Sequence, residues 1–137
     1  DLLTNHWTEK KSVPYALSAG TGAVYKDQLL VFGGDKGETF HRTEELIAAI
    51  NAANDELTKK KLTDEKTALQ SAHPGFSKEI LSYNIMNDSW DVIGNNPYAT
   101  PVTTSTVTWS NCFFIPSGEI KAGVRSPFIL SAKPTTK

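Results

Sequence analysis

The sequence lacks the features that mark disulfide scaffolds, metal centres and membrane spans. It contains one cysteine, Cys112, so an internal disulfide is excluded. No run of about 18 apolar residues occurs, so no transmembrane helix and no membrane partner are expected. His6, His41 and His73 do not have the spacing of metal ligands, and we expect no metal. Phosphate-binding loops of the Gly-x-x-x-x-Gly-Lys-Ser/Thr type and Gly-x-Ser-x-Gly elbows are also missing.

An excess of charge of either sign is missing as well. Lys and Arg number 14 and Asp and Glu 15, giving a formal net charge of -1. A nucleic-acid partner is therefore not expected, because such proteins need a concentrated basic field. With 137 residues, 39% of them hydrophobic, the chain suits one compact domain, residues 1–137. It opens without Met and without the pattern of a secretion signal, so we expect a processed or excised chain.

The sequence repeats once, imperfectly. Trp7 is followed seven residues later by Pro14, and Trp90 seven residues later by Pro97. Each proline precedes small and β-branched residues, an aromatic residue, a polar turn and an apolar strand. The two apolar strands, 29–32 and 112–115, run up to glycine at Gly33-Gly34 and Ser117-Gly118. A shared order of this kind indicates a structural repeat; the alternative is two unrelated hairpins.

The local patterns are those of β-strands. Short apolar or alternating runs bounded by Gly, Pro, Asn and Asp predict strands near residues 2–8, 15–25, 28–33, 78–85, 89–93, 100–109, 112–116 and 126–132. Asn87-Asp88 predicts a hairpin turn. The run 28–33 is nearly all apolar, so we expect both of its faces to be covered. Trp7, Trp90 and Trp109 are interpreted as packing anchors, and Cys112 as a small buried hydrophobe.

Residues 35–77 break this pattern and separate the two copies. Leu46, Ile50, Ala53 and Leu57 form a helical stripe, which Lys59-Lys60-Lys61 would end favourably for the helix dipole. Thr63 is a candidate cap for a second short helix through Gln70. We therefore predict a helical hairpin inserted in a β loop. The insertion is either functional or decorative.

Two sets of residues carry a family resemblance. Gly33-Gly34, Tyr83 and Trp90 resemble the landmarks of the kelch repeat, which forms one four-stranded blade of a β-propeller. The segment 117–127, Ser-Gly-Glu-Ile-Lys-Ala-Gly-Val-Arg-Ser-Pro, resembles the Gly-Glu-x-Lys-x-Gly-x-Arg segment of the N-acetylneuraminate epimerases, or sialic acid mutarotases. Its place near the C-terminus is similar to the circularly permuted branch of that family. Ser117 stands where the family commonly has glycine, which adopts a positive φ more readily.

The resemblance implies an all-β fold that is the C-terminal part of a propeller. One blade would span residues 14–93, including the helical insertion 35–77, and a partial blade would span residues 97–132. The leading strand would complete the partial blade. Two blades leave sheet faces open, so we expect the remaining blades, or other copies of the chain, to cover them.

The resemblance also implies an activity without a cofactor, the interconversion of N-acetylneuraminate anomers by general acid/base catalysis. Glu119 matches the proposed proton acceptor, and Arg125 matches a pocket arginine suited to the substrate carboxylate. The alternatives are that Glu119 faces solvent or pairs with Lys121, and that Arg125 forms a surface salt bridge. A second candidate function is a non-catalytic kelch module that binds protein or glycan. Family resemblance alone suggests a periplasmic or otherwise exported protein, and we expect the fragment alone to be inactive.

Overall fold

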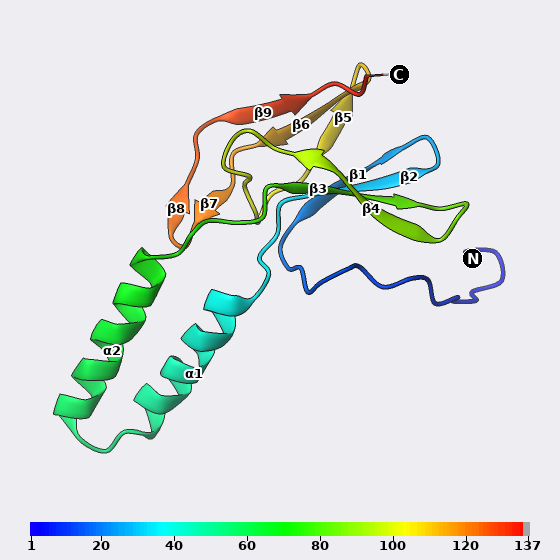
Figure 1. Ribbon diagram of the computed structural model, residues 1–137. Helices are drawn as coiled ribbons and strands as arrows, with labels where there is room; N and C mark the ends of the chain where they lie inside the picture. Colours follow the sequence, from blue (N-terminus) through cyan, green and yellow to red (C-terminus); the bar gives the residue numbers. More distant parts are fainter. Residues whose placement is uncertain (136–137) are drawn as a thin grey trace.

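The computed structural model describes residues 1–135, which form two antiparallel sheets, a small hairpin and a pair of helices (Figure 1). The first sheet has the order β1-β2-β3-β4 and the second the order β5-β6-β9, while β7 and β8 pair with each other. The elements are β1 Thr21–Tyr25, β2 Gln28–Phe32, α1 Glu38–Ala52, α2 Glu56–Ser71, β3 Glu79–Asn84, β4 Ser89–Asn95, β5 Val107–Trp109, β6 Cys112–Pro116, β7 Glu119–Lys121, β8 Val124–Arg125 and β9 Ile129–Ala132. No helix among the described residues is long and apolar enough to cross a membrane.

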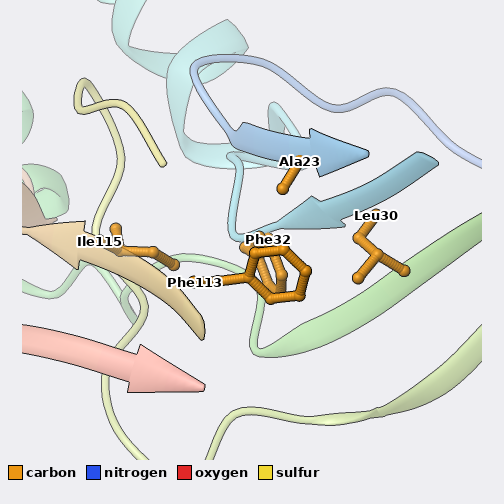
Figure 2. Packing of buried hydrophobic residues seen from close by; sticks show 5 residues of the cluster. All are labelled: Ala23, Leu30, Phe32, Phe113 and Ile115. Atoms are coloured by element: carbon orange, nitrogen blue, oxygen red, sulfur yellow. The ribbon is translucent and has the colours of Figure 1, made fainter. Parts of the chain in front are cut away.

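The core lies between the two sheets (Figure 2). Strand alternation places Leu30 and Phe32 of β2 on one face of the first sheet, and Ala23 of β1 lies on the same face because it is the register partner of Leu30. Phe113 and Ile115 of β6 meet them from the second sheet. The Phe113 ring lies 5.9 Å from Phe32 and 6.1 Å, edge-on, from Tyr25. These aromatic contacts join the two copies of the repeat into one body.

Most strands expected from the sequence are confirmed, with corrections at four segments, one of which is 126–132, where only Ile129–Ala132 forms a strand. The expected strand 2–8 was wrong: this segment contains a turn, and the Trp7 side chain is 89% exposed. The strands expected at 15–25 and 100–109 are shortened to β1 and β5. Each is interrupted by a left-handed residue, Ala19 with φ 56° and Thr103 with φ 53°, which no continuous strand accommodates.

The β3–β4 hairpin at Asn87-Asp88 is confirmed, and Asp88 has the positive φ such a turn requires. Tyr83 and Trp90 lie opposite each other in it, with ring centroids 5.0 Å apart. The expectation that β2 is covered on both faces was wrong for the described residues. Leu30 is buried on one face of the sheet, whereas its neighbour Leu29 is exposed on the other. Trp109 is 71% exposed and so does not act as a packing anchor within residues 1–135, and Cys112 is only half-buried.

The helical hairpin is confirmed between β2 and β3, but its break falls earlier than the stripe predicted. Asp55 caps α2 by accepting a hydrogen bond from the Thr58 amide, so the expected first helix ends at Ala52. Leu57 therefore belongs to α2 and is exposed. Thr63 is no cap, because its hydroxyl donates to the Lys59 carbonyl inside α2. The lysines 59–61 likewise lie in α2 rather than at the end of α1.

The core arrangement predicts a large effect of truncating Phe113. This side chain is 3% exposed and touches both sheets, so Phe113→Ala should lower the free energy of unfolding by about 3–5 kcal/mol. Urea denaturation measures the loss. Trp109→Ala is the matched control on the open face of the same sheet, where the loss should stay below about 1 kcal/mol. Equal losses in the two variants would contradict the described core.

Candidate functional site

The two candidate site residues lie opposite each other in the small hairpin β7–β8, which the sequence patterns did not predict. Glu119 of β7 is the register partner of Arg125 of β8. Directly opposed residues of an antiparallel pair project from the same face, so the carboxylate and the guanidinium share one face of the hairpin. Within residues 1–135, the ion pairs include none between Glu119 and either Arg125 or Lys121.

The backbone of Glu119 is held on both sides. Its amide donates to the Val102 carbonyl at 3.0 Å, and the Val102 amide donates to the Glu119 carbonyl at 2.8 Å. Val102 is itself buried. The Glu119 carboxylate accepts a hydrogen bond from the Gly123 amide in the hairpin turn. Glu119 is half-buried and Arg125 is exposed, so the guanidinium is open to solvent beside a carboxylate whose backbone is fixed.

The turn that precedes Glu119 depends on two left-handed residues. Ser117 has φ 52° and Gly118 has φ 110°. The Ser117 hydroxyl donates to the Ser126 carbonyl at 2.7 Å, which stabilises a conformation that serine adopts reluctantly. A Cβ atom at Gly118 would lie 2.7 Å from Cβ of Pro101, closer than such atoms approach. Serine therefore replaces the expected glycine at the first position, while the second position requires glycine.

The same turn occurs in the first copy of the repeat. Gly33 and Gly34 have φ values of 69° and 106°, close to those of Ser117 and Gly118, which lie 84 positions later. A bridge of two backbone hydrogen bonds then joins Ser18 to Asp35, as one joins Val102 to Glu119. The structural repeat is thus confirmed, and two unrelated hairpins are excluded. Asp35 is the counterpart of Glu119, and its carboxylate also caps a turn, accepting from the Gly37 amide.

A largely apolar cavity of about 710 Å³ lies between the two sheets and reaches Ile120 and Ser126, the chain neighbours of Glu119 and Arg125. It is lined by residues of the open edge, including Phe128 and Ile129, and by Ile80 and Tyr98 across the gap. Neither Glu119 nor Arg125 lines it. Its lining includes the hydroxyl groups of Tyr98, Ser126 and Ser131 but no carboxylate, imidazole or amino side chain.

A charged cluster lies beside the first-copy turn. The Lys36 ammonium donates to the Glu79 carboxylate at 2.8 Å and lies 4.3 Å from the centre of the Tyr15 ring. The Tyr15 hydroxyl donates to the same carboxylate. The hydrogen bonds from Lys36 and then Tyr15 hold the pKa of the Glu79 carboxyl below its usual value. The hydrogen bond to Glu79 raises the pKa of Lys36. No group of three potential metal ligands occurs within residues 1–135.

Comparisons with solved structures define the class of protein. The chain matches the structure of YjhT, a kelch β-propeller, with a TM-score of 0.76 at 19% identity. The match covers 96% of this chain and 38% of that one. The chain therefore has the fold of part of a kelch-type propeller, as the sequence predicted.

Sequence comparisons then give the family. The family model of N-acetylneuraminate epimerase matches residues 1–136, so the chain belongs to this family. Among curated relatives, N-acetylneuraminate epimerase of Vibrio vulnificus is 27% identical over 92% of this chain and 33% of its own length. The enzyme of the same name from Salmonella typhimurium is 28% identical over 93% of this chain, again 33% of its own length. A kelch domain-containing protein of Vibrio cholerae is 23% identical over 92% of this chain and 36% of its own length. The chain thus spans about a third of these relatives.

The turn before Glu119 predicts that position 118 accepts only glycine. Gly118→Ala should lower stability by about 1–3 kcal/mol, because its positive φ and the contact with Pro101 both oppose a side chain. Thermal unfolding measures this. Gly94→Ala is the control, since a Cβ there would meet nothing within 4 Å. A Gly118→Ala protein as stable as Gly94→Ala would show that the turn is described wrongly.

The Glu79 cluster predicts a pH dependence of stability. A carboxyl whose pKa is lowered in the folded state stabilises the fold above its unfolded pKa of about 4.3, and loses this contribution as the pH falls through the folded value. Urea unfolding at pH 7 should therefore show Glu79→Gln less stable than the parent protein. The difference should shrink below about pH 4. A difference that stays constant down to pH 3 would contradict the ionic role of Glu79.

Proposed function

We propose that the complete protein interconverts the anomers of N-acetylneuraminate, and that this chain supplies a proton-transfer group, Glu119, and a carboxylate-binding group, Arg125. Membership of the N-acetylneuraminate epimerase family supports the substrate. The observation that carries the proposal is the direct pairing of Glu119 with Arg125 in β7–β8, which gives both groups one face. The chain covers about a third of the curated relatives, so the activity is proposed for the complete protein.

The chemistry of ring opening suits these two groups. The anomeric hydroxyl must lose a proton while the ring oxygen gains one, and closure on the other face reverses both transfers. A single carboxylate beside the anomeric centre can accept the proton and return it, which contributes a factor of about 10²–10⁴ in rate. The Gly123 amide and the Val102 bridge hold the Glu119 carboxylate and its backbone in place before substrate arrives.

N-acetylneuraminate carries its own carboxylate on the anomeric carbon. A guanidinium binds such a planar anion through two parallel hydrogen bonds. Arg125 is exposed and lacks an ion-pair partner among residues 1–135, so its donors are available to an incoming anion. Binding the substrate carboxylate at Arg125 would bring the anomeric hydroxyl, which is on the same carbon, toward Glu119. The two side chains on one face of the hairpin would then contact the two substituents of the anomeric carbon.

The rest of the site would come from chain beyond these two sheets. The outward face of the first sheet leaves Val24 and Val92 exposed, and the second sheet leaves Val107 exposed. Such faces pack on neighbouring blades in a propeller. We propose that further blades, or other copies of the chain, cover them and complete the pocket, and that residues 1–137 alone are inactive.

Anomer exchange followed by NMR tests the proposal in the full-length polypeptide. Glu119→Gln keeps the shape of the side chain but removes the base, so the enzymatic exchange rate should fall by about 10²–10⁴. Glu9→Gln, an exposed site in the N-terminal segment, is the control and should leave the rate unchanged. If the Glu119→Gln protein exchanges as fast as the control, the proposed proton transfer is wrong. If the unchanged protein binds the sugar without accelerating exchange, a non-catalytic glycan-binding module is the better description.

A second variant tests Arg125. Arg125→Ala should raise KM for N-acetylneuraminate at least tenfold with a smaller effect on kcat, because the carboxylate is bound before and after ring opening. Binding of a neutral sugar, measured by calorimetry on the same variant, should be unchanged. A loss that is equal for neutral and carboxylated sugars would assign Arg125 to the fold rather than to the anion.

A further inference from the structure

The helical insertion and the Glu119 hairpin occupy the same loop of the repeat. In each copy the loop begins after the second strand and its left-handed turn, at Asp35 in the first copy and at Glu119 in the second. Figure 1 shows the hairpin β7–β8 beside the end of α2 where the chain returns to the sheet. Both loops therefore emerge from the same end of the two sheets, and the insertion lies next to the candidate site.

The returning segment of the insertion passes close to the Glu119 hairpin. A Cβ atom added at Gly75 would lie at van der Waals distance, 3.4 Å, from the Ile120 carbonyl oxygen. Ile120 follows Glu119 in the same strand. The Ser77 amide then donates to the Gly34 carbonyl at 2.9 Å, which ties the returning segment to the first-copy turn. The base of the insertion is thus bonded to the first-copy turn and lies close to the strand of Glu119.

A pocket of about 350 Å³ lies at this base, which we call the insertion pocket. Asp35, Lys36 and Thr39 line it from the entering segment, and His73, Gly75 and Ser77 line it from the returning one. Gly75 lines the pocket and lies close to Ile120 of β7, so the pocket is near the Glu119 hairpin. The pocket is at the small end of the range for ligand sites, which suits one substituent of a sugar rather than a whole sugar.

The groups in the insertion pocket are mixed and held in place. The Lys36 ammonium is fixed by Glu79 and by the Tyr15 ring. His73 is buried, its Nδ1 accepts from the Gly75 amide at 3.0 Å, and its ring packs on Phe76 at 5.1 Å. Positive and negative side chains line the pocket together, so it has no strong preference for an anion. Hydroxyl groups, which both donate and accept, match such a lining.

We propose that the insertion pocket binds the trihydroxypropyl arm of the sugar acid and so determines which substrates are accepted, with Lys36 as a specificity residue. This inference rests on the proposed function, because it assigns a second region of the same substrate. It gives the helical insertion a role, because its two ends build this pocket near Glu119. The chemistry at the anomeric carbon stays with Glu119 and Arg125.

Kinetics on the full-length polypeptide test this, with anomer exchange measured on N-acetylneuraminate and on an analogue that lacks the trihydroxypropyl arm. Lys36→Met should raise KM for the complete sugar about tenfold, change kcat less than twofold, and leave KM for the shortened analogue unchanged. Lys60→Met, on the exposed face of α2, is the control and should alter neither. An equal change for both substrates, or none for either, would overturn the proposal.

A second variant guards against misfolding of the Lys36 protein. Thr39→Arg adds bulk in the first turn of α1, at the wall of the pocket, and should likewise raise KM for the complete sugar alone. An analogue that lacks the acetyl group is a further arm of the test: if only its KM is unaffected by Thr39→Arg, the pocket binds the acetyl arm and our assignment is wrong. Loss of exchange in Glu119→Gln with unchanged KM in the Lys36 and Thr39 variants would sustain the proposed function while removing this inference.

Discussion

The structure depends on a turn of two left-handed residues followed by a two-hydrogen-bond bridge. In the second copy the turn is Ser117-Gly118, and the bridge joins Val102 to Glu119. The turn ends the second strand of its sheet, and the bridge residue follows it immediately, in the register of the same antiparallel ladder. The segment that follows the bridge therefore begins at a fixed position, at the same end of the sheet in both copies. In one copy that is the helical hairpin and in the other it is the hairpin β7–β8.

This constraint explains how a small core supports a defined site. Few residues are deeply buried between the sheets, and several apolar side chains of the outer faces are open to solvent. The position of Glu119 nevertheless does not depend on distant packing, because Val102, Gly118 and the Gly123 amide fix it locally. Arg125 follows from register, since a hairpin of this length sets it opposite Glu119. Local hydrogen bonding thus fixes the candidate site on a partial propeller.

The sequence predicted the repeat, most strands and the helical insertion, because turn residues and apolar periodicity are local properties. It placed Leu57 in the first helix because the stripe continues in phase across the break; the cap at Asp55 was the feature that located the boundary. The strand near Trp7 failed for a different reason: a strand needs a partner, and residues 1–135 provide none for that segment. Glu119 and Arg125 came from family resemblance, and no pattern of polarity predicted that they would face each other across a hairpin.

In the proposed function, the hydroxyl and the carboxylate on the anomeric carbon meet Glu119 and Arg125, the paired residues of one hairpin. A crystal structure of the full-length polypeptide bound to N-acetylneuraminate measures this most directly. The account predicts the anomeric hydroxyl within hydrogen-bond distance of the Glu119 carboxylate, and the sugar carboxylate against the Arg125 guanidinium. A sugar bound with its anomeric carbon away from β7–β8, or in the apolar cavity between the sheets, would contradict it.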